Sequence, residues 1–214
     1  MKKLTLLPLV LLTASAWAAN YNDTTANNSF ATAVNLNPYF STGVNPDVGD
    51  SLGNNTALQA PWVTVNGLGN GGYDYYQFTT AVQGRVIFDI DYTFGYSGNT
   101  SGFDSMLWVY NSAYQVGGLN DDEFSLGAGA GGSFSTRDSF IEMQGLSAGT
   151  YYVRVAAGGV SDLPLYDGAR YTLQVQSFQI AAVPEPSSYA MLLGGLTLLA
   201  GVRLARQKKQ RVRA

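Results

Sequence analysis

Residues 85–92 read RVIFDIDY, and this stretch decides the fold class. Successive side chains of an extended strand point to opposite faces, so one face here is apolar or aromatic and the other carries both aspartates. The first face consists of Val86, Phe88, Ile90 and Tyr92, and the second of Arg85, Ile87, Asp89 and Asp91. We expect a β-strand whose second face is solvated, with a carboxylate pair at Asp89 and Asp91 as the alternative.

Six further stretches share this character: they are short, rich in β-branched and aromatic residues, and bounded by turn-forming residues. They are residues 62–65, 73–79, 106–110, 139–143, 151–155 and 171–178. Between them, residues 127–132 (GAGAGG) are typical of a loop, and residues 29–34 of a brief helix or an irregular lead-in. Strands at this spacing, without a sustained helical period, predict an all-β fold, an antiparallel β-sandwich.

The amino terminus is typical of a secretory signal peptide. Lys2 and Lys3 precede the apolar residues 4–12, and residues 16–18 (AWA) place small side chains where a signal peptidase requires them. We therefore expect residues 1–19 to be a signal peptide removed by signal peptidase, with an uncleaved anchor as the alternative.

The carboxyl terminus has three parts in a fixed order. Pro184, Glu185 and Pro186 come first, and the prolines favour an extended backbone suited to the cleft of a processing enzyme. An apolar stretch, residues 189–202, follows and predicts a single transmembrane helix, with a buried helix of a soluble domain as the alternative. Six basic residues follow it and favour a cytoplasmic end: Arg203, Arg206, Lys208, Lys209, Arg211 and Arg213.

This ending resembles the PEP-CTERM sorting signal of bacterial envelope proteins. The resemblance implies processing by an exosortase-type enzyme near Pro184, Glu185 and Pro186, after transient anchoring in the inner membrane. It also implies release to the cell surface or the extracellular matrix, with a link to exopolysaccharide and biofilm. We accordingly divide the chain into a signal peptide, a β-domain at residues 20–180 and a sorting signal at residues 181–214.

The charge of the β-domain is hidden by the basic ends of the chain. All 15 acidic residues lie between Asp23 and Glu185, and the only basic residues there are four arginines, which leaves −11. Nucleic acid is therefore excluded as an expected partner, whereas divalent cations fit; the alternative is that the acidity only keeps the protein soluble. The chain has no cysteine or histidine, so its expected stability comes from core packing, with metal as a further source.

A second resemblance covers most of residues 20–178. Short motifs occur in order at residues 22–23 (ND), 74–78 (DYYQF), 103–105 (FDS), 120–122 (NDD) and 149–153 (GTYYV). Together they resemble bacterial pre-peptidase C-terminal (PPC) domains, which are jelly-roll-like sandwiches often appended to secreted peptidases. The resemblance therefore implies a jelly-roll-like version of the predicted sandwich.

The PPC resemblance also implies a calcium site, because some relatives bind calcium near their first strand. Asn22, Asp23 and Asp74 match the positions that supply oxygen ligands there. Ala18 and Asn20 replace the family's acidic lead-in, so this site has fewer carboxylates than in those relatives.

A second acidic cluster follows from composition alone. Asp121 and Asp122, flanked by Asn120 and Glu123, form an acidic loop that suits a hard cation, together with Asp104. The alternative is a turn in which Asn and Asp side chains bond their own backbone.

Trp62 and Trp108 are candidates for stacking against sugars. Trp62 lies beside Pro61 and a loop, so we expect it to be exposed and able to hold a ligand. Trp108 lies within an apolar run, so we expect it in the core.

These features favour an exported, non-enzymatic protein with a structural or adhesive role in an exopolysaccharide or biofilm matrix. One alternative is a carbohydrate-binding module for exopolysaccharide. Another is a hydrolase built on carboxylates, with Asp104, Asp121, Asp122 and Glu142 as its available acids. A serine hydrolase is excluded as an expectation, because the β-domain offers neither histidine nor lysine as a base.

Overall fold

The computed structural model describes residues 20–94, 102–123, 127–133, 136–159, 162–179 and 197. The predicted signal peptide and almost all of the predicted sorting signal lie outside these residues. The chain divides into two compact units, and every described residue except Thr197 belongs to the larger, Ala18–Val183. Within the described part, no helix is long and apolar enough to cross a membrane.

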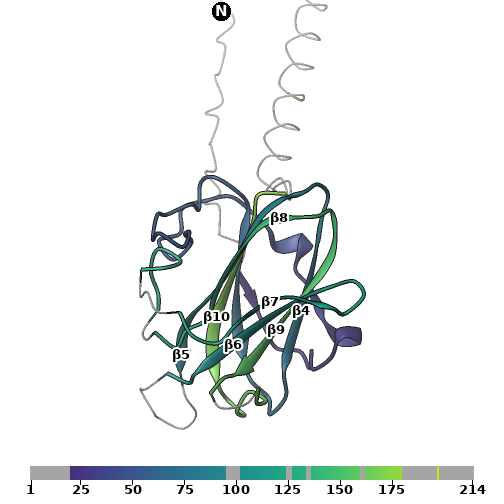
Figure 1. Cartoon of the computed structure of the whole chain (residues 1–214), viewed down its shortest axis with the longest axis vertical. Helices are drawn as coiled ribbons and strands as arrows, with labels where there is room; N and C mark the ends of the chain where they lie inside the picture. The colour runs from purple at the N-terminus through teal and green to yellow at the C-terminus, as the bar shows by residue number, and fades with distance from the viewer. Residues whose placement is uncertain are drawn as a thin grey trace, which may run out of the picture. The chain divides into compact units, whose positions relative to one another are not determined.

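The larger unit contains two five-stranded sheets that pack face to face as a β-sandwich (Figure 1). Sheet A has the order β1 (Asn20–Asn22), β3 (Trp62–Leu68), β10 (Arg170–Ser177), β5 (Gly84–Phe94) and β8 (Phe140–Leu146). Sheet B has the order β2 (Val34–Asn35), β4 (Asp74–Thr80), β9 (Gly149–Ala157), β6 (Ser105–Asn111) and β7 (Val116–Asn120). Two short 3-10 helices, η1 (Phe30–Thr32) and η2 (Asn37–Tyr39), flank β2.

The predicted all-β sandwich is confirmed, and each of the seven expected strands is present. The expectation of purely antiparallel pairing is wrong at the two edges formed by the start of the domain. There β1 pairs with β3, and β2 with β4, in parallel. β1, β2 and β7 carry no alternating apolar pattern, so they could not be predicted from hydrophobic periodicity.

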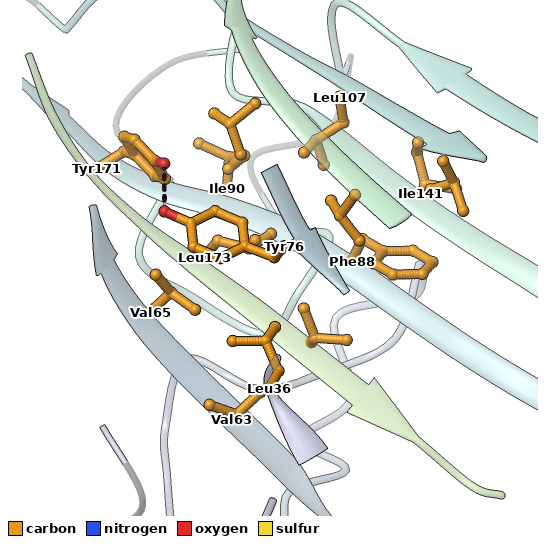
Figure 2. Packing of buried hydrophobic residues seen from close by; sticks show 14 of the residues in the cluster. Leu36, Val63, Val65, Tyr76, Phe88, Ile90, Leu107, Ile141, Tyr171 and Leu173 are labelled. Atoms are coloured by element: carbon orange, nitrogen blue, oxygen red, sulfur yellow. Dashed lines mark hydrogen bonds between the residues drawn. The ribbon is translucent and has the colours of Figure 1, made fainter. Parts of the chain in front are cut away.

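The core lies between the sheets and is built from every second residue of the long strands (Figure 2). Phe88 and Ile90 from β5 and Leu173 from β10 face Leu107 from β6, and all four side chains are fully buried. Each such side chain contributes roughly 1.5–3 kcal/mol by leaving water. The predicted inward face of residues 85–92 is therefore confirmed for Val86, Phe88 and Ile90.

Tyr92 departs from that pattern. Its φ is +49°, and the pairing of β5 with β10 shifts register between Arg170 and Thr172, which lie opposite this point. The bulge interrupts the two-residue alternation. The Tyr92 ring is absent from the core cluster, and its hydroxyl donates to Asp47 Oδ2 at 3.2 Å.

The outer face of sheet A is covered by chain rather than by solvent. Residues 41–60 lie across it, and Gln176 of β10 donates its side-chain amide to the carbonyl oxygens of Thr56 and Ala60, at 2.7 and 3.2 Å. Nearly every residue of β10 is buried on both faces as a result. The expectation of a solvated second face for β5 is therefore wrong, because the sequence pattern did not reveal this covering segment.

Candidate functional site

A hydrogen-bonded chain of four side chains joins the two sheets inside the sandwich. The Tyr76 hydroxyl of β4 donates to Asp23 Oδ2 at 2.6 Å, and the Tyr171 hydroxyl of β10 lies 2.6 Å from Asp74 Oδ2. The two hydroxyl oxygens are 2.8 Å apart, the contact drawn as a dashed line in Figure 2. The structure thus brings together Asp23 and Asp74, which the sequence predicted as neighbours.

The surroundings of Asp74 disfavour its charged form. Tyr171 donates to Asp74 Oδ2, whereas Asp74 Oδ1 is buried without a partner. Burial raises the pKa of Asp74 to about 7, the hydrogen bond from Tyr171 acts against this rise, and the charge of Asp23 adds to it.

The donors around Asp23 explain why it remains an acceptor. Besides Tyr76, its carboxylate accepts from the backbone and hydroxyl of Thr25, at 3.1 and 3.2 Å, and from the amide of Asn27 at 2.9 Å. Four donors satisfy the charge without a metal ion. Asn22 lies on the surface instead, where its Oδ1 accepts from Asn66 at 2.7 Å. The predicted calcium ligands Asn22, Asp23 and Asp74 thus do not converge on one position.

Of the second predicted cluster, the structure brings Asp104 and Asp121 close together. Asp104 and Asp121 flank Gly158, where a Cβ atom would lie 3.2 Å from Asp104 Oδ1 and 2.0 Å from Asp121 Oδ1. Burial, followed by the charges of Asp121 and Asp122, raises the pKa of Asp104. Asp122 is exposed, and its carbonyl accepts from the Asn120 amide at 3.1 Å, as the turn alternative expected.

No three acidic, histidine or cysteine side chains within the described ranges are arranged to hold a metal ion. Glu142, the remaining acid considered for hydrolysis, pairs with Arg85 at 3.0 Å. Its pKa is lowered by the Ser51 backbone amide and by Arg85, against the effect of burial. A carboxylate in this state does not serve as a proton donor near neutral pH.

Trp62 is fully buried, so the expectation that it stacks against a ligand is wrong. It points to the outer face of sheet A, where residues 41–60 cover it and Val48 and Ala57 pack against it. Its indole N–H donates to the Gly43 carbonyl at 3.3 Å. The adjacent loop that suggested exposure is the segment that buries it.

Trp108 shows the reverse, since it lies half-buried on the outer face of sheet B rather than in the core. Its neighbours Leu107 and Val109 take the inward positions. The Trp108 and Tyr110 rings are nearly parallel, at 10° with centroids 6.1 Å apart. The alternation of large aromatic and smaller aliphatic residues in β6 was the signal that could have identified this face.

Arg154 organises the rings around Trp108. It lies directly across from Trp108 on β9, and its guanidinium carbon is 4.7 Å from the Trp108 ring centroid and 4.6 Å from that of Tyr73. Asp162 forms an ion pair with the same guanidinium. Such cation–π contacts each contribute roughly 0.5–2 kcal/mol and hold the rings in fixed positions.

A second group of rings continues the same face. Phe30 of η1 contacts four tyrosines from three strands and the β6–β7 turn, with centroid distances between 4.3 and 5.3 Å: Tyr75, Tyr110, Tyr114 and Tyr152. Tyr114 is 53 % exposed, whereas Tyr75 and Tyr110 are 8 % exposed. We call this set, with Tyr73, Trp108 and Arg154, the aromatic face of sheet B.

Pro184, Glu185 and Pro186 lie outside the described residues, so their role rests on sequence comparison. No curated protein matches the chain. Two solved structures are similar to it. The pre-peptidase C-terminal domain of collagenase from Bacillus anthracis is 15% identical, with 52% of this chain and 84% of that chain covered at a TM-score of 0.32. The periplasmic g-type lysozyme inhibitor PliG from Aeromonas hydrophila is 17% identical, with 55% and 86% covered at a TM-score of 0.33.

The carboxyl-terminal comparison is specific to one segment. Residues 182–209 match the model of the PEP-CTERM protein-sorting motif. This range contains Pro184, Glu185, Pro186, the apolar stretch after them and the basic residues up to Lys209. Sorting of this kind implies export, a tail that associates transiently with the membrane, and processing by an exosortase. The chain therefore carries a PEP-CTERM protein-sorting motif at its carboxyl end, as its sequence pattern predicted.

Proposed function

We propose that the protein is an exported adhesive component of an extracellular polysaccharide matrix, which it binds through the aromatic face of sheet B. The sorting motif supports delivery beyond the inner membrane. The single observation that supports binding is the fixed group of rings around Arg154. This choice joins the expected adhesive role with the carbohydrate-binding alternative and places the contact at Trp108 instead of Trp62.

The aromatic face has the chemistry that pyranose rings require. The C–H faces of sugars stack on flat aromatic surfaces, and nearby hydroxyl and amide groups fix their orientation. Trp108 provides a half-buried ring that lies nearly parallel to the buried ring of Tyr110, and Tyr114 and Tyr152 add hydroxyl groups at the exposed end. Because Arg154 and the ring contacts fix these side chains in advance, binding loses little conformational entropy.

Charge favours a neutral polysaccharide as the ligand. The region from Asp23 to Glu185 carries 15 acidic residues against four arginines, so an anionic polymer would be repelled. Arg154 does not offset this charge, because Asp162 pairs with it.

A non-catalytic role is part of the proposal. It is supported by the sequence, which lacks histidine and cysteine throughout. It is also supported by the placement of Glu142, whose carboxylate pairs with Arg85 on sheet A and is held at a low pKa.

The binding proposal is tested with the full chain in detergent and neutral exopolysaccharide isolated from the host, by affinity gel electrophoresis. We expect Trp108→Ala and Tyr114→Ala each to weaken retention about five- to tenfold, since stacking of one ring contributes on the order of 1–1.5 kcal/mol. Tyr166→Ala is the matched control, because Tyr166 is 52 % exposed but lies outside the aromatic face. Equal retention of all three variants and the parent would refute the proposal.

The sorting proposal is tested separately by mass spectrometry of the form exported by the host. We expect a carboxyl terminus near Pro184–Pro186, and an exported chain that still ends at Ala214 would contradict exosortase processing.

A further inference from the structure

Two buried aspartates and a buried glutamine lie together on the outer face of sheet A. Asp89 and Asp91 alternate along β5, and Gln174 of β10 lies opposite Asp89 in the register. Asp89 is 2 % exposed, Asp91 0 % and Gln174 3 %. Their side chains lie on the face opposite the core residues Phe88, Ile90 and Leu173, so the burial comes from loops packed on this face.

Oxygen atoms in this group are buried without partners. Among the described residues, Asp89 Oδ2, Asp91 Oδ2 and Gln174 Oε1 have no hydrogen-bond donor. Asp91 accepts from the Ser133 hydroxyl at 3.1 Å and from the side chain of Gln174. Buried acceptors normally have partners, because an unpaired one loses its hydrogen bonds to water without replacing them, and the cost is larger for a charged group.

The charges that act most strongly on the pair are all negative. Asp91, Asp138, Asp47 and Glu123 act on Asp89, and Asp47 and Asp138 act on Asp91. Burial and these charges raise the pKa of Asp89 strongly and that of Asp91 to about 8. The arginine nearest in sequence, Arg85, is engaged with Asp50 and Glu142 at 3.7 and 3.0 Å.

The glycine loop at residues 127–133 closes over the two carboxylates. A Cβ atom on Gly129 would lie 1.6 Å from Asp89 Oδ2, and one on Gly132 would lie 2.4–2.7 Å from the Asp91 carboxylate atoms. Both glycines have positive φ, +78° and +95°. Only glycine allows the backbone to approach the oxygens this closely in this conformation, which accounts for glycine at positions 129 and 132.

We propose that Asp89, Asp91 and Gln174 form a divalent-cation site of calcium type, closed by the glycine loop 127–133. Two carboxylates and a side-chain carbonyl supply the hard oxygen donors that calcium prefers. The set contains no nitrogen or sulfur ligand, which disfavours zinc and copper. Fewer than three acidic side chains take part, in agreement with the lack of any larger metal-binding group in the described residues.

This site is separate from the predicted sets at Asp23 and Asp104, and it does not depend on polysaccharide binding. The carboxylates of Asp23 already have four donors, whereas those of Asp89 and Asp91 retain unpartnered oxygens. A cation would pair these oxygens, offset the mutual repulsion and fix the loop onto sheet A.

The test is calcium titration of the full chain in detergent, by isothermal calorimetry and by thermal unfolding against EDTA. Extracellular calcium modules bind with dissociation constants of about 10⁻⁴–10⁻³ M, and we expect binding in this range and a rise in Tm of at least about 5 °C at saturation. We expect Asp89→Asn and Asp91→Asn each to weaken binding at least about tenfold. Both variants should also raise Tm in EDTA, because they remove a buried charge.

Two matched controls locate the site. Asp121→Asn and Asn22→Ala remove side chains of the other two sets at positions that are not fully buried, and each should keep the calcium affinity of the parent. The proposal is overturned if the parent shows neither heat of binding nor a shift in Tm, if both β5 variants retain the affinity, or if a control variant loses it.

Discussion

The protein buries two pairs of aspartates whose hydrogen-bonding environments differ. Asp23 and Asp74 lie between the sheets, where Tyr76 and Tyr171 link them into a continuous hydrogen-bonded chain. Asp89 and Asp91 lie on the outer face of sheet A under the glycine loop, and each keeps an unpartnered oxygen. In the first pair, four donors satisfy Asp23 and Tyr171 donates to Asp74 Oδ2, while Asp74 Oδ1 has no partner. In the second pair, each carboxylate has an unpartnered oxygen and is raised in pKa by negative neighbours, so a proton or a cation is needed to complete it.

The difference shows that burial alone does not define a metal site. The resemblance to PPC domains led us to expect Asp23 as a calcium ligand, yet its carboxylate accepts from Thr25, Asn27 and Tyr76. Asp89 and Asp91, which the sequence assigned to a solvated face, each have a buried oxygen without a donor. The number of donors around each carboxylate therefore separates a structural role from a binding role.

The largest expected effect is at Asp23. Replacing it as Asp23→Asn presents an amide to the hydroxyl of Tyr76 and the amide of Asn27, and should lower the free energy of unfolding by about 3 kcal/mol, since several hydrogen bonds to one charge are lost. Urea unfolding in EDTA measures it. Asp122→Asn, at an exposed position, is the control. If Asp23→Asn loses no more stability than Asp122→Asn, the donors around Asp23 do not stabilise the fold.

A somewhat smaller loss of stability is expected from Gly129→Ala. The added Cβ meets Asp89 Oδ2 at 1.6 Å and the φ is +78°, so we expect about 2–3 kcal/mol of destabilisation and loss of the calcium-dependent rise in Tm. Gly71→Ala separates the two causes, because its φ is +83° but nothing lies within 4 Å. Equal losses at both glycines would show that contact with Asp89 contributes nothing.

The pH dependence tests the interior pair. The pKa of Asp74 is about 7 in the folded protein and about 3.9 when unfolded, so the folded state holds the extra proton between these values. Stability is therefore retained below about pH 4 and is lost as the pH rises toward 7 and above. We expect the free energy of unfolding to fall about 2 kcal/mol more between pH 5 and 8 in the parent than in Asp74→Asn, measured in EDTA. Identical profiles would show that Asp74 is ionised in the folded state.

The smallest change in stability, and the only increase, is expected at the outer pair, Asp89 and Asp91. In EDTA, Asp89→Asn should raise the free energy of unfolding by about 1 kcal/mol, because it removes repulsion from Asp91 and the cost of burying the acid. The opposite signs of Asp23→Asn and Asp89→Asn in the same chelator would establish the comparison. A decrease in the free energy of unfolding for both Asp23→Asn and Asp89→Asn would instead show that Asp89 has a structural role.

The alternation in residues 85–92 was sufficient to predict a strand, and equivalent patterns predicted six others, because burying one face requires a two-residue period. The same reasoning failed for Trp62 and Trp108. A strand pattern distinguishes two faces, but it does not say which face of a sheet a distant segment covers. Residues 41–60 bury Trp62, while Arg154 and Tyr73 hold Trp108 at the surface of sheet B.

The sequence by itself determined the fold class and the sorting motif, because alternating hydrophobicity and the order of prolines, apolar residues and basic residues are local properties of the chain. The tertiary structure decided which aspartates have donors and which rings face outward. Those properties depend on contacts between residues far apart in the chain, such as Asp23 with Tyr76, Asp89 with Gly129, and Trp108 with Arg154. A carboxylate's role follows from the donors brought to it by folding, and these are absent from its own sequence neighbourhood.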